Sequence, residues 1–315
     1  MLVIIDKYIP FLRGILEPYC EVKYLEPDEI TADSVSDADA LLVRSRTRCD
    51  AALLEGSKVR FIATATIGYD HIDTAYCESH GIFWTNCPGC NAQGVCDYVE
   101  EAIRTTPAAS VKKSPVMGIV GVGHVGSLVA EMAERRGCRV LLNDPPKGIG
   151  VPLEQIAREA DIITFHTPLT KDGAYPTYHL CDEHFLSLCK KNAVIINAAR
   201  GGVIDEEAAL LPENRGKIFV IDTWEGEPDI NKRLLDAAEI ATCHIAGYTL
   251  QGKVNATNMC LSALCKHFSL PELQVPAETL PTPRHAGQYW LLEVDHKLRQ
   301  NPEYFEYLRE TYPLR

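Results

Sequence analysis

The sequence predicts an α/β protein with two doubly wound parallel-sheet domains and a short C-terminal extension. Three observations lead to this prediction. The length of 315 residues exceeds one ordinary domain and favours two. Short apolar runs alternate with helical stretches through most of the chain. A glycine-rich turn joins one of these runs to a helix near the middle of the chain.

The composition is that of a folded globular protein. Hydrophobic residues make up 46% of the chain and charged residues 23%, which excludes disordered, collagen-like and coiled-coil classes. The net charge of −12, from 31 basic and 43 acidic residues, argues against nucleic acid or an anionic membrane as a partner. No apolar run approaches the roughly 18 residues that span a bilayer, and the first ten residues do not resemble a signal peptide. We therefore expect a cytoplasmic protein whose cysteines are reduced thiols.

The first third of the chain predicts the strands of one sheet. The runs are LVIID at the start, ALLVRSR around Leu42, FIATATIG around Ala63 and IFWTN around Phe83. Each run ends in glycine, proline, asparagine or charged residues, as strands of a covered parallel sheet should. The pattern NAQGVCDYVEEAIR then predicts a helix, and the short polar stretch TTPAASVKKSP predicts a crossing into a second domain.

The second third repeats the alternation more clearly. Its predicted strands are VMGIVG, CRVLLND, DIITFHTP, AVIINAAR, IFVIDTW and EIATCHIAG, and SLVAEMAERRG predicts a helix after the first. This order is typical of a right-handed, doubly wound parallel sheet. After Gly247, the stretch QGKVNATNMCLSALCKHF predicts one amphipathic helix. We expect residues 1–92 and 249–270 to form one domain, residues 93–248 the other, and residues 271–315 the extension.

The strongest local signal is the segment GIVGVGHVGSLVAEMAERRGCRVLLND. Gly121 allows a tight turn, Gly123 lets a pyrophosphate approach the backbone, and Gly126 permits close packing of helix on strand. A second strand ends at Asp144, whose carboxylate suits the hydroxyls of an adenine ribose and repels a 2′-phosphate. The segment predicts NAD as the cofactor, in preference to NADP.

Three polar residues follow later strands of the same predicted sheet. They are Arg200 in INAARGGVIDE, Glu227 in IDTWEGEP and His244 in TCHIAGYT. Ligands of an open α/β sheet bind outside the carboxyl ends of its strands, so these residues can meet in one cleft. The set suits hydride transfer at a 2-hydroxy acid, with an imidazole for the hydroxyl proton, a carboxylate to orient it and a guanidinium for the substrate carboxylate. A capping arginine, a surface glutamate and a core histidine are the structural alternatives.

The chain from about residue 40 to 260 resembles the D-isomer-specific 2-hydroxyacid dehydrogenases. The resemblance is carried by the glycine turn, FHTPLT, NAARGGVIDE, DTWEGEP and HIAGYT. It implies a Rossmann-type NAD domain, a flavodoxin-like substrate domain and a homodimer. The motifs LLVRSRT, ATATIGYDHID, NDPP, WEGEP and HIAGYTLQGK are similar to a branch of the family that acts on a small phosphorylated 2-hydroxy acid.

The resemblance implies catalytic roles for Arg200, Glu227 and His244. The cofactor contacts that it and the glycine turn imply are Gly121, Gly123, His124, Val125, Gly126, Asp144, Thr167, Ala198, Ala199, Arg200, Asp222 and Gly247. The substrate contacts expected from the resemblance and from the charge after the second predicted strand are Arg44, Ser45, Arg46, Thr66 and Tyr248.

Several alternatives stay open at this point. Cys87 and Cys90 have a C-x-x-C spacing, but neighbouring cysteines lack the spacing of a second pair, so we expect packing thiols and no metal. The substrate could instead be 3-phosphoglycerate, glyoxylate or hydroxypyruvate. A protein of this fold can also act without catalysis, as an NAD-sensing partner like the corepressors that resemble this family.

Overall fold

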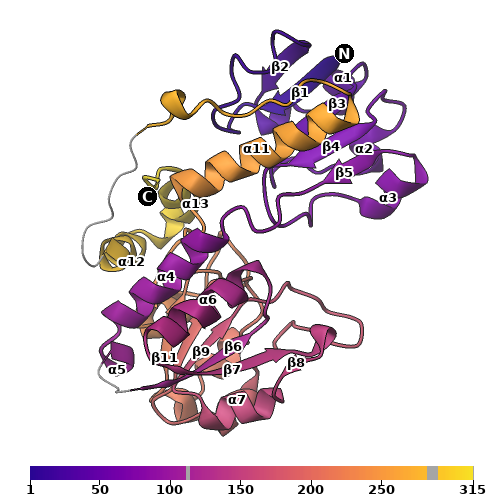
Figure 1. Ribbon diagram of the computed structural model, residues 1–315. Helices are drawn as coiled ribbons and strands as arrows, with labels where there is room; N and C mark the ends of the chain where they lie inside the picture. Colours follow the sequence, from indigo (N-terminus) through magenta and orange to yellow (C-terminus); the bar gives the residue numbers. More distant parts are fainter. Residues whose placement is uncertain (111–113, 282–289, 315) are drawn as a thin grey trace. The chain divides into compact units, whose positions relative to one another are not determined.

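A computed structural model describes residues 1–110, 114–281 and 290–314, which form two compact units (Figure 1). Unit 1 is Met1–Asn91 with Thr249–Pro283, and unit 2 is Ala92–Tyr248 with Arg284–Arg315, as far as the described residues define them. Of the helices in these described ranges, none has the length and hydropathy of a membrane span.

The described residues of unit 1 form a five-stranded parallel sheet in the order β2-β1-β3-β4-β5. The strands are β1 (Leu2–Asp6), β2 (Glu21–Leu25), β3 (Ala40–Val43), β4 (Phe61–Thr64) and β5 (Phe83–Thr85). This order is that of the flavodoxin-like fold, which confirms the predicted class. The edge strand β2 was not predicted, because its sequence EVKYL mixes charged and apolar residues and is only half-buried.

Short helices and one long helix complete unit 1. They are η1 (Pro27–Glu29), α1 (Ala32–Val35), α2 (Ala51–Leu54), α3 (Thr74–Ser79), α11 (Leu250–His267) and η4 (Ala277–Thr279). The long helix α11 lies against β4 (Figure 1). Its first turn is capped by the Thr249 hydroxyl, which accepts a hydrogen bond from Gly252 N–H at 3.0 Å. Leu261 and Leu264 lie on its apolar face and are buried.

The described residues of unit 2 form a seven-stranded sheet in the order β12-β11-β10-β9-β6-β7-β8. The strands are β6 (Val116–Val120), β7 (Arg139–Asp144), β8 (Ile149–Gly150), β9 (Ile162–Phe165), β10 (Val194–Asn197), β11 (Ile218–Ile221) and β12 (Ile240–Ala241). All neighbours are parallel except β8, which runs antiparallel to β7. The sheet confirms the predicted Rossmann-type fold, while the two-residue strand β8 was not predicted.

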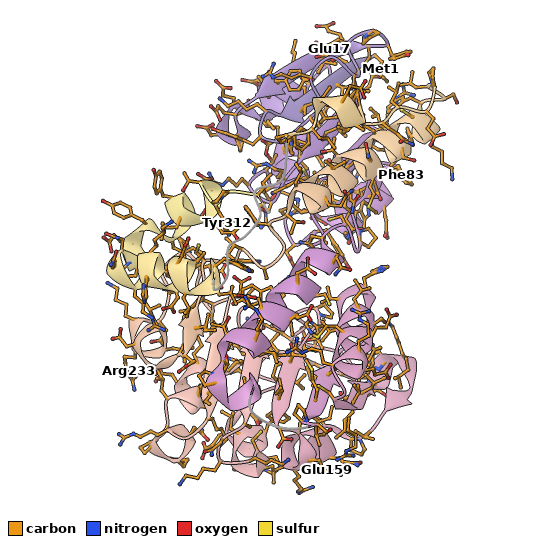
Figure 2. The ribbon with its side chains drawn as sticks, turned by 60° about the vertical axis from the view of Figure 1, so that its left-hand side comes forward. Met1, Glu17, Phe83, Glu159, Arg233 and Tyr312 are labelled. Carbon is orange, nitrogen blue, oxygen red and sulfur yellow. The ribbon has the colours of Figure 1, made fainter. Side chains whose placement is uncertain are left out.

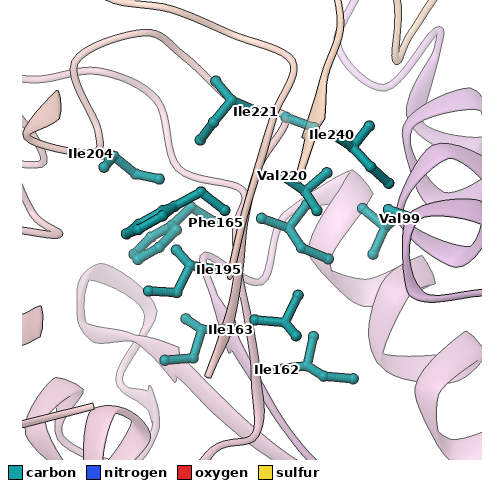
Figure 3. Close-up of a cluster of buried hydrophobic side chains, with 14 of the residues drawn as sticks. Val99, Ile162, Ile163, Phe165, Ile195, Ile204, Val220, Ile221 and Ile240 are labelled. Carbon is teal, nitrogen blue, oxygen red and sulfur yellow. The ribbon is translucent and has the colours of Figure 1, made fainter. Parts of the chain in front are cut away.

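The helices of unit 2 pack on this sheet, and an aliphatic core is buried between helices and strands. They are α4 (Ala92–Thr105), α5 (Pro107–Ser110), α6 (His124–Arg135), η2 (Pro145–Lys147), α7 (Leu153–Glu159), α8 (Glu183–Leu188), α9 (Glu206–Ala209), η3 (Pro212–Asn214) and α10 (Lys232–Ala237). Figure 3 shows Ile163, Ile195 and Val220 from successive strands, with Val99 of α4 near them. Part of the predicted crossing stretch, residues 111–113, lies outside the described residues.

The C-terminal stretch differs from the expected extension. The helices α12 (Trp290–Gln300), η5 (Pro302–Tyr304) and α13 (Phe305–Glu310) belong to unit 2, whereas the described residues up to 281 belong to unit 1. The reason is the helical spacing of Leu291, Val294 and Leu298, which with Phe305 are buried in the unit 2 core. Helix α12 lies against β12 and α4.

Hydrogen bonds, in addition to apolar contacts, hold the C-terminal helices in unit 2. The buried carboxylate of Asp295 accepts hydrogen bonds from Ala241 N–H on β12 and from Arg299 Nε, both at 2.8 Å. Arg299 also donates through Nη1 to the Leu235 carbonyl and through Nη2 to the Ala238 carbonyl. One guanidinium therefore satisfies three acceptors at the end of α10 and on α12.

Replacing Arg299 by glutamine should lower the free energy of unfolding by about 2 to 4 kcal/mol, because a buried carboxylate and two carbonyls lose their partner. Urea denaturation measures the change. The control is Arg233→Gln at the surface of unit 2 (Figure 2), where the ion pair with Glu207 is 68% and 69% exposed. Equal losses in both variants would contradict the proposed anchor.

Candidate active site

The glycine turn between β6 and α6 has no space for side chains at two of its glycines. Gly121 has a φ of +88°, and a Cβ there would lie 2.7 Å from the His166 carbonyl oxygen. A Cβ on Gly126 would lie 1.9 Å from the Gly121 carbonyl oxygen. A Cβ on Gly123, in contrast, would meet nothing within 4 Å. The turn is therefore tight on its inner side and open at Gly123, as an approaching phosphate needs.

The surroundings of the turn offer donors and one carboxylate. Gly123 caps α6 without a side-chain bond, so the first N–H groups of this helix are presented at the turn. His124 is exposed and Val125 is half-buried in the first helical turn. Asp144, at the end of β7, accepts a hydrogen bond from Val122 N–H at 2.9 Å. The Thr167 hydroxyl is buried and has no hydrogen-bond partner among the described residues.

Glu227 and His244 form the centre of the candidate site. His244 Nδ1 lies 2.8 Å from Glu227 Oε2, and Glu227 Oε1 accepts a hydrogen bond from Trp224 N–H at 2.9 Å. Because a carboxylate only accepts hydrogen bonds, the proton of the neutral imidazole lies on Nδ1. The other ring nitrogen, Nε2, is then a proton acceptor. The structure thus brings together two of the three predicted catalytic residues.

Charge and burial act in opposite senses on this pair. Burial alone would lower the pKa of His244, but the charge and hydrogen bond of Glu227 and the charge of Asp222 outweigh it and raise the pKa. Burial would raise the pKa of Glu227, but His244, the Trp224 N–H and Arg309 together lower it. Each partner thus stabilises the charged form of the other, as expected for a carboxylate that stabilises an imidazolium when one forms.

Asp222 holds the loop that carries His244. Its fully buried carboxylate accepts hydrogen bonds from the Thr242 hydroxyl at 2.6 Å and from the N–H groups of Ile245 and Ala246 at 2.8 and 2.9 Å. Burial raises the pKa of Asp222. The Asp222 carbonyl also accepts from His244 N–H at 2.8 Å. The carboxylate that we predicted as a cofactor contact is thus fully engaged with its own chain.

Arg200 lies in the loop after β10, two strands from β12. Its Nη1 donates to the Ala199 carbonyl at 2.8 Å, and Asn197 Nδ2 donates to the Arg200 carbonyl at 3.0 Å. A Cβ on Gly201 would lie 1.9 Å from the Trp224 carbonyl oxygen. The loop of Arg200 and the loop of Glu227 are therefore in backbone contact, at the carboxyl ends of adjacent strands.

The predicted substrate residues of unit 1 also follow neighbouring strands. Arg44 Nε donates to the buried carboxylate of Asp6 at 2.9 Å, and its Cζ lies 5.1 Å from the Tyr8 ring centroid. Ser45 and Arg46 are exposed beside it. The Thr66 hydroxyl donates to the Gly68 carbonyl at 2.8 Å and therefore shapes the turn after β4. Arg44, Ser45 and Arg46 follow β3 and Thr66 follows β4, so these cations and hydroxyls lie at the carboxyl ends of adjacent strands.

The last predicted site residues lie on the loop after β12, in unit 2. Gly247 and Tyr248 are half-buried there, and Tyr248 N–H donates to the Ile245 carbonyl at 2.9 Å. Tyr248 also packs against the core of this unit. Both residues directly follow the segment that Asp222 holds.

Sequence reasoning missed three residues near these clusters. Asp6 is the last residue of β1, so the rule that ligands bind at the carboxyl ends of strands could have found it. Tyr98 bonds the Thr242 hydroxyl at 2.8 Å, and Arg309 Nη1 lies 3.7 Å from Glu227 Oε2. The last two partnerships join segments distant in sequence, and no local pattern signals them.

The C-x-x-C pair lies in unit 1, in thiol and carbonyl surroundings. Cys87 Sγ lies 3.6 Å from Cys260 Sγ and bonds the carbonyls of Thr64 and Ala256. Burial raises the pKa of Cys90 to about 12. Thiols in this state pack as small apolar groups.

Comparison with known proteins supports the geometry. Residues 100–246 match the family described as D-isomer specific 2-hydroxyacid dehydrogenase, NAD binding domain. The whole chain is 46% identical to an erythronate-4-phosphate dehydrogenase of Bacteroides fragilis, of which the match covers 97%. With that of Porphyromonas gingivalis the identity is 43%, over 99% of this chain and 92% of the relative. An NAD+-bound 3-phosphoglycerate dehydrogenase of Entamoeba histolytica has a TM-score of 0.72 and 26% identity, covering 88% of this chain and 98% of its own.

Two alanine substitutions in the glycine turn should have opposite consequences. Gly126→Ala places a methyl group on a backbone oxygen and should lower the free energy of unfolding by about 3 kcal/mol or more. Gly123→Ala should leave that free energy nearly unchanged but weaken dinucleotide binding, since the methyl occupies the open side of the turn. Denaturation and a fluorescence titration with NAD separate the two effects. A Gly126→Ala protein as stable as the parent would contradict the packing described here.

Proposed function

The chain belongs to the D-isomer-specific 2-hydroxyacid dehydrogenase family, and we propose that it oxidises 4-phospho-D-erythronate to 2-oxo-3-hydroxy-4-phosphobutanoate with NAD, a step of pyridoxal phosphate biosynthesis. The observation that carries the proposal is the Glu227–His244 pair, 2.8 Å apart, in a chain 46% identical over its length to an erythronate-4-phosphate dehydrogenase. The same site supports an NAD-dependent oxidoreductase acting on a CH–OH group.

His244 is the proposed general base. Nε2 accepts the proton of the substrate C2 hydroxyl, and the imidazolium that forms keeps its Nδ1–H bond to Glu227. The carboxylate both orients the ring and stabilises its positive charge. In the reverse direction the same imidazolium donates the proton. Because the pKa of His244 is raised, oxidation should need a higher pH than reduction.

Arg200 is the proposed carboxylate clamp. It lies in the loop that touches the Glu227 loop at Gly201, and its guanidinium can bind a substrate carboxylate through two parallel hydrogen bonds. The backbone contact between the two loops fixes how closely the clamp loop approaches the loop of Glu227, the carboxylate that orients the base. Holding the acid in this way orients its C2 hydroxyl toward His244.

The residues around the glycine turn fit NAD. The open side of Gly123, the start of α6 and the unpartnered Thr167 hydroxyl would hold the pyrophosphate, and Asp144 the adenine ribose. His124, Val125, Ala198, Ala199 and Gly247 complete the proposed contacts. When bound, NAD supplies the acceptor for the hydride from C2.

Unit 1 is the proposed source of specificity for the phosphoryl group. Arg44, Ser45 and Arg46 place two cations and a hydroxyl after β3, and a phosphate dianion needs such charge-assisted donors. Asp6 fixes Arg44 and neutralises part of its charge. Thr66 and Tyr248 are the further proposed substrate contacts. The homodimer and the cytoplasmic location expected from the sequence stay predictions.

A substrate panel tests the activity. With NAD, 4-phospho-D-erythronate should give a kcat/KM about 100-fold or more above those of D-erythronate and glycolate, which lack the phosphate that the arginines would bind, and above that of 3-phosphoglycerate, which is one carbon shorter. NADH fluorescence measures the rates. A preference for 3-phosphoglycerate or an unphosphorylated acid would overturn the substrate assignment. Binding of NAD without turnover of any acid would favour the non-catalytic alternative.

The same assay tests the base. His244→Gln should lower kcat about 1,000-fold, within the range of general-base catalysis, and leave the Kd for NAD within about twofold. The matched control is His184→Gln on α8, where the histidine is exposed and remote from Glu227. Near-normal turnover of the His244 variant would exclude the proposed mechanism.

Asp144 should set the preference between the two nicotinamide cofactors. Asp144→Asn removes the charge that repels a 2′-phosphate, so we expect the NAD to NADP ratio of kcat/KM to fall about tenfold or more. Asp161→Asn is the control, because Asp161 also accepts a backbone N–H, from Val116, but precedes β9. An unchanged ratio in the Asp144 variant would contradict the assigned ribose contact.

A further inference from the structure

Arg309 brings the C-terminal segment to the candidate base. It lies on α13, which is anchored in unit 2 by the fully buried Phe305. Its Nη2 donates to both carboxylate oxygens of Glu306, at 2.8 and 2.7 Å. Its Nη1 lies 3.7 Å from Glu227 Oε2, the same oxygen that bonds His244. One carboxylate oxygen is therefore placed between an imidazole and a guanidinium.

The Arg309 guanidinium is largely shielded from solvent. The side chains of Arg309 and Glu227 are 20% and 18% exposed, so solvent screens their attraction weakly. Nε of Arg309 is buried without a hydrogen-bond partner in the described part of the chain. Its Nη2 contacts belong to its own helix, whereas its Nη1 forms an ion pair with Glu227, outside that helix.

Three segments of the chain place charged or titratable groups near His244. After β11 there are the carboxylates of Asp222 and Glu227. From α13 comes Arg309, with Glu306 behind it. On the loop after β12 the Cys243 thiol stays neutral, since burial raises its pKa to about 12. Without Arg309, the imidazole would face two carboxylates and no cation from these elements.

We propose that Arg309 is a positioning residue, whose charge holds the Glu227 carboxylate and keeps His244 ready to accept the substrate proton. The proposal rests on the proposed function for its catalytic meaning. The physical reason is that a cation beside an imidazole disfavours its protonated form. Arg309 accordingly lowers the pKa of both Glu227 and His244, against the stronger opposing effect of Glu227 on His244.

Arg309→Gln should move the acid limb of the pH profile for oxidation to higher pH by about 0.5 to 1 unit. At pH values below the midpoint, the variant should oxidise the substrate about threefold or more slowly than the parent. On the alkaline side the two rates should be equal. Arg309→Lys keeps the charge and should restore the midpoint. NMR titration of the His244 imidazole, assigned with His244→Gln, should show the same displacement without any substrate.

Two further variants separate charge from structure. Arg299→Gln loosens the same C-terminal segment without changing a charge next to Glu227, so it should lower stability and keep the midpoint. Glu306→Gln removes the half-buried negative charge that pairs with Arg309 and should move the midpoint to lower pH by a few tenths of a unit. If Arg309→Gln does not fold, the midpoint of the Glu306→Gln variant is the measurement that tests the proposal.

The outcomes are distinct. A folded Arg309→Gln protein with the parental midpoint and His244 titration overturns the proposal. So does a loss of activity that is equal at every pH and is not rescued by lysine, because it would show a structural role only. If the parent protein does not oxidise 4-phospho-D-erythronate, the proposed function fails, while the NMR titration still decides the role of Arg309.

Discussion

Asp222 is buried at the end of β11, and its carboxylate accepts three hydrogen bonds from the segment that carries His244. His244 itself has a φ of +55°, a conformation that is costly for a residue with a Cβ and persists only when its surroundings impose it. The bonds to Asp222 impose it here. Thr242, one of the three donors, also bonds Tyr98 on α4 and, through its carbonyl, the indole of Trp224. The direction of the imidazole is thus determined by a network of buried polar groups rather than by the rotamer of one side chain.

The rest of the candidate site depends on this network through the backbone. The Trp224 N–H donates to Glu227, and Glu227 in turn bonds His244. The positions of the carboxylate and of the imidazole therefore both depend on the backbone at Trp224. The aliphatic core under these loops, drawn in part in Figure 3, keeps the ends of the parallel strands in register. Electrostatics then act on a fixed geometry. Two carboxylates favour the imidazolium, and the guanidinium of the C-terminal segment opposes them. Arg309 therefore opposes part of the rise in the pKa of His244 that the two carboxylates cause.

Much of this arrangement could be predicted from the sequence, for reasons that differ between elements. The buried parallel strands are nearly continuous apolar runs, and the glycine turn has a spacing that few other structures require, so both were found. The strand β2 was missed because an edge strand needs little apolar surface. The helices of residues 290–310 do carry apolar residues at helical spacing, but their place against β12 depends on tertiary contacts. Asp222 was expected to contact the cofactor, which stays a prediction, and only the coordinates show that its carboxylate accepts three hydrogen bonds from the segment that carries His244. Arg309 could not be assigned because its partner is 82 residues away.

The close contact of Gly201 with the Trp224 carbonyl has a consequence for redesign of this protein. A methyl group at residue 201 would overlap that carbonyl, so the approach of the Arg200 loop to the Glu227 loop cannot be adjusted in small steps at that position. A library that randomises residue 201 would return glycine. Side chains that can change length without a backbone clash lie instead in the loops after β1, β3 and β4 of unit 1, where they are exposed.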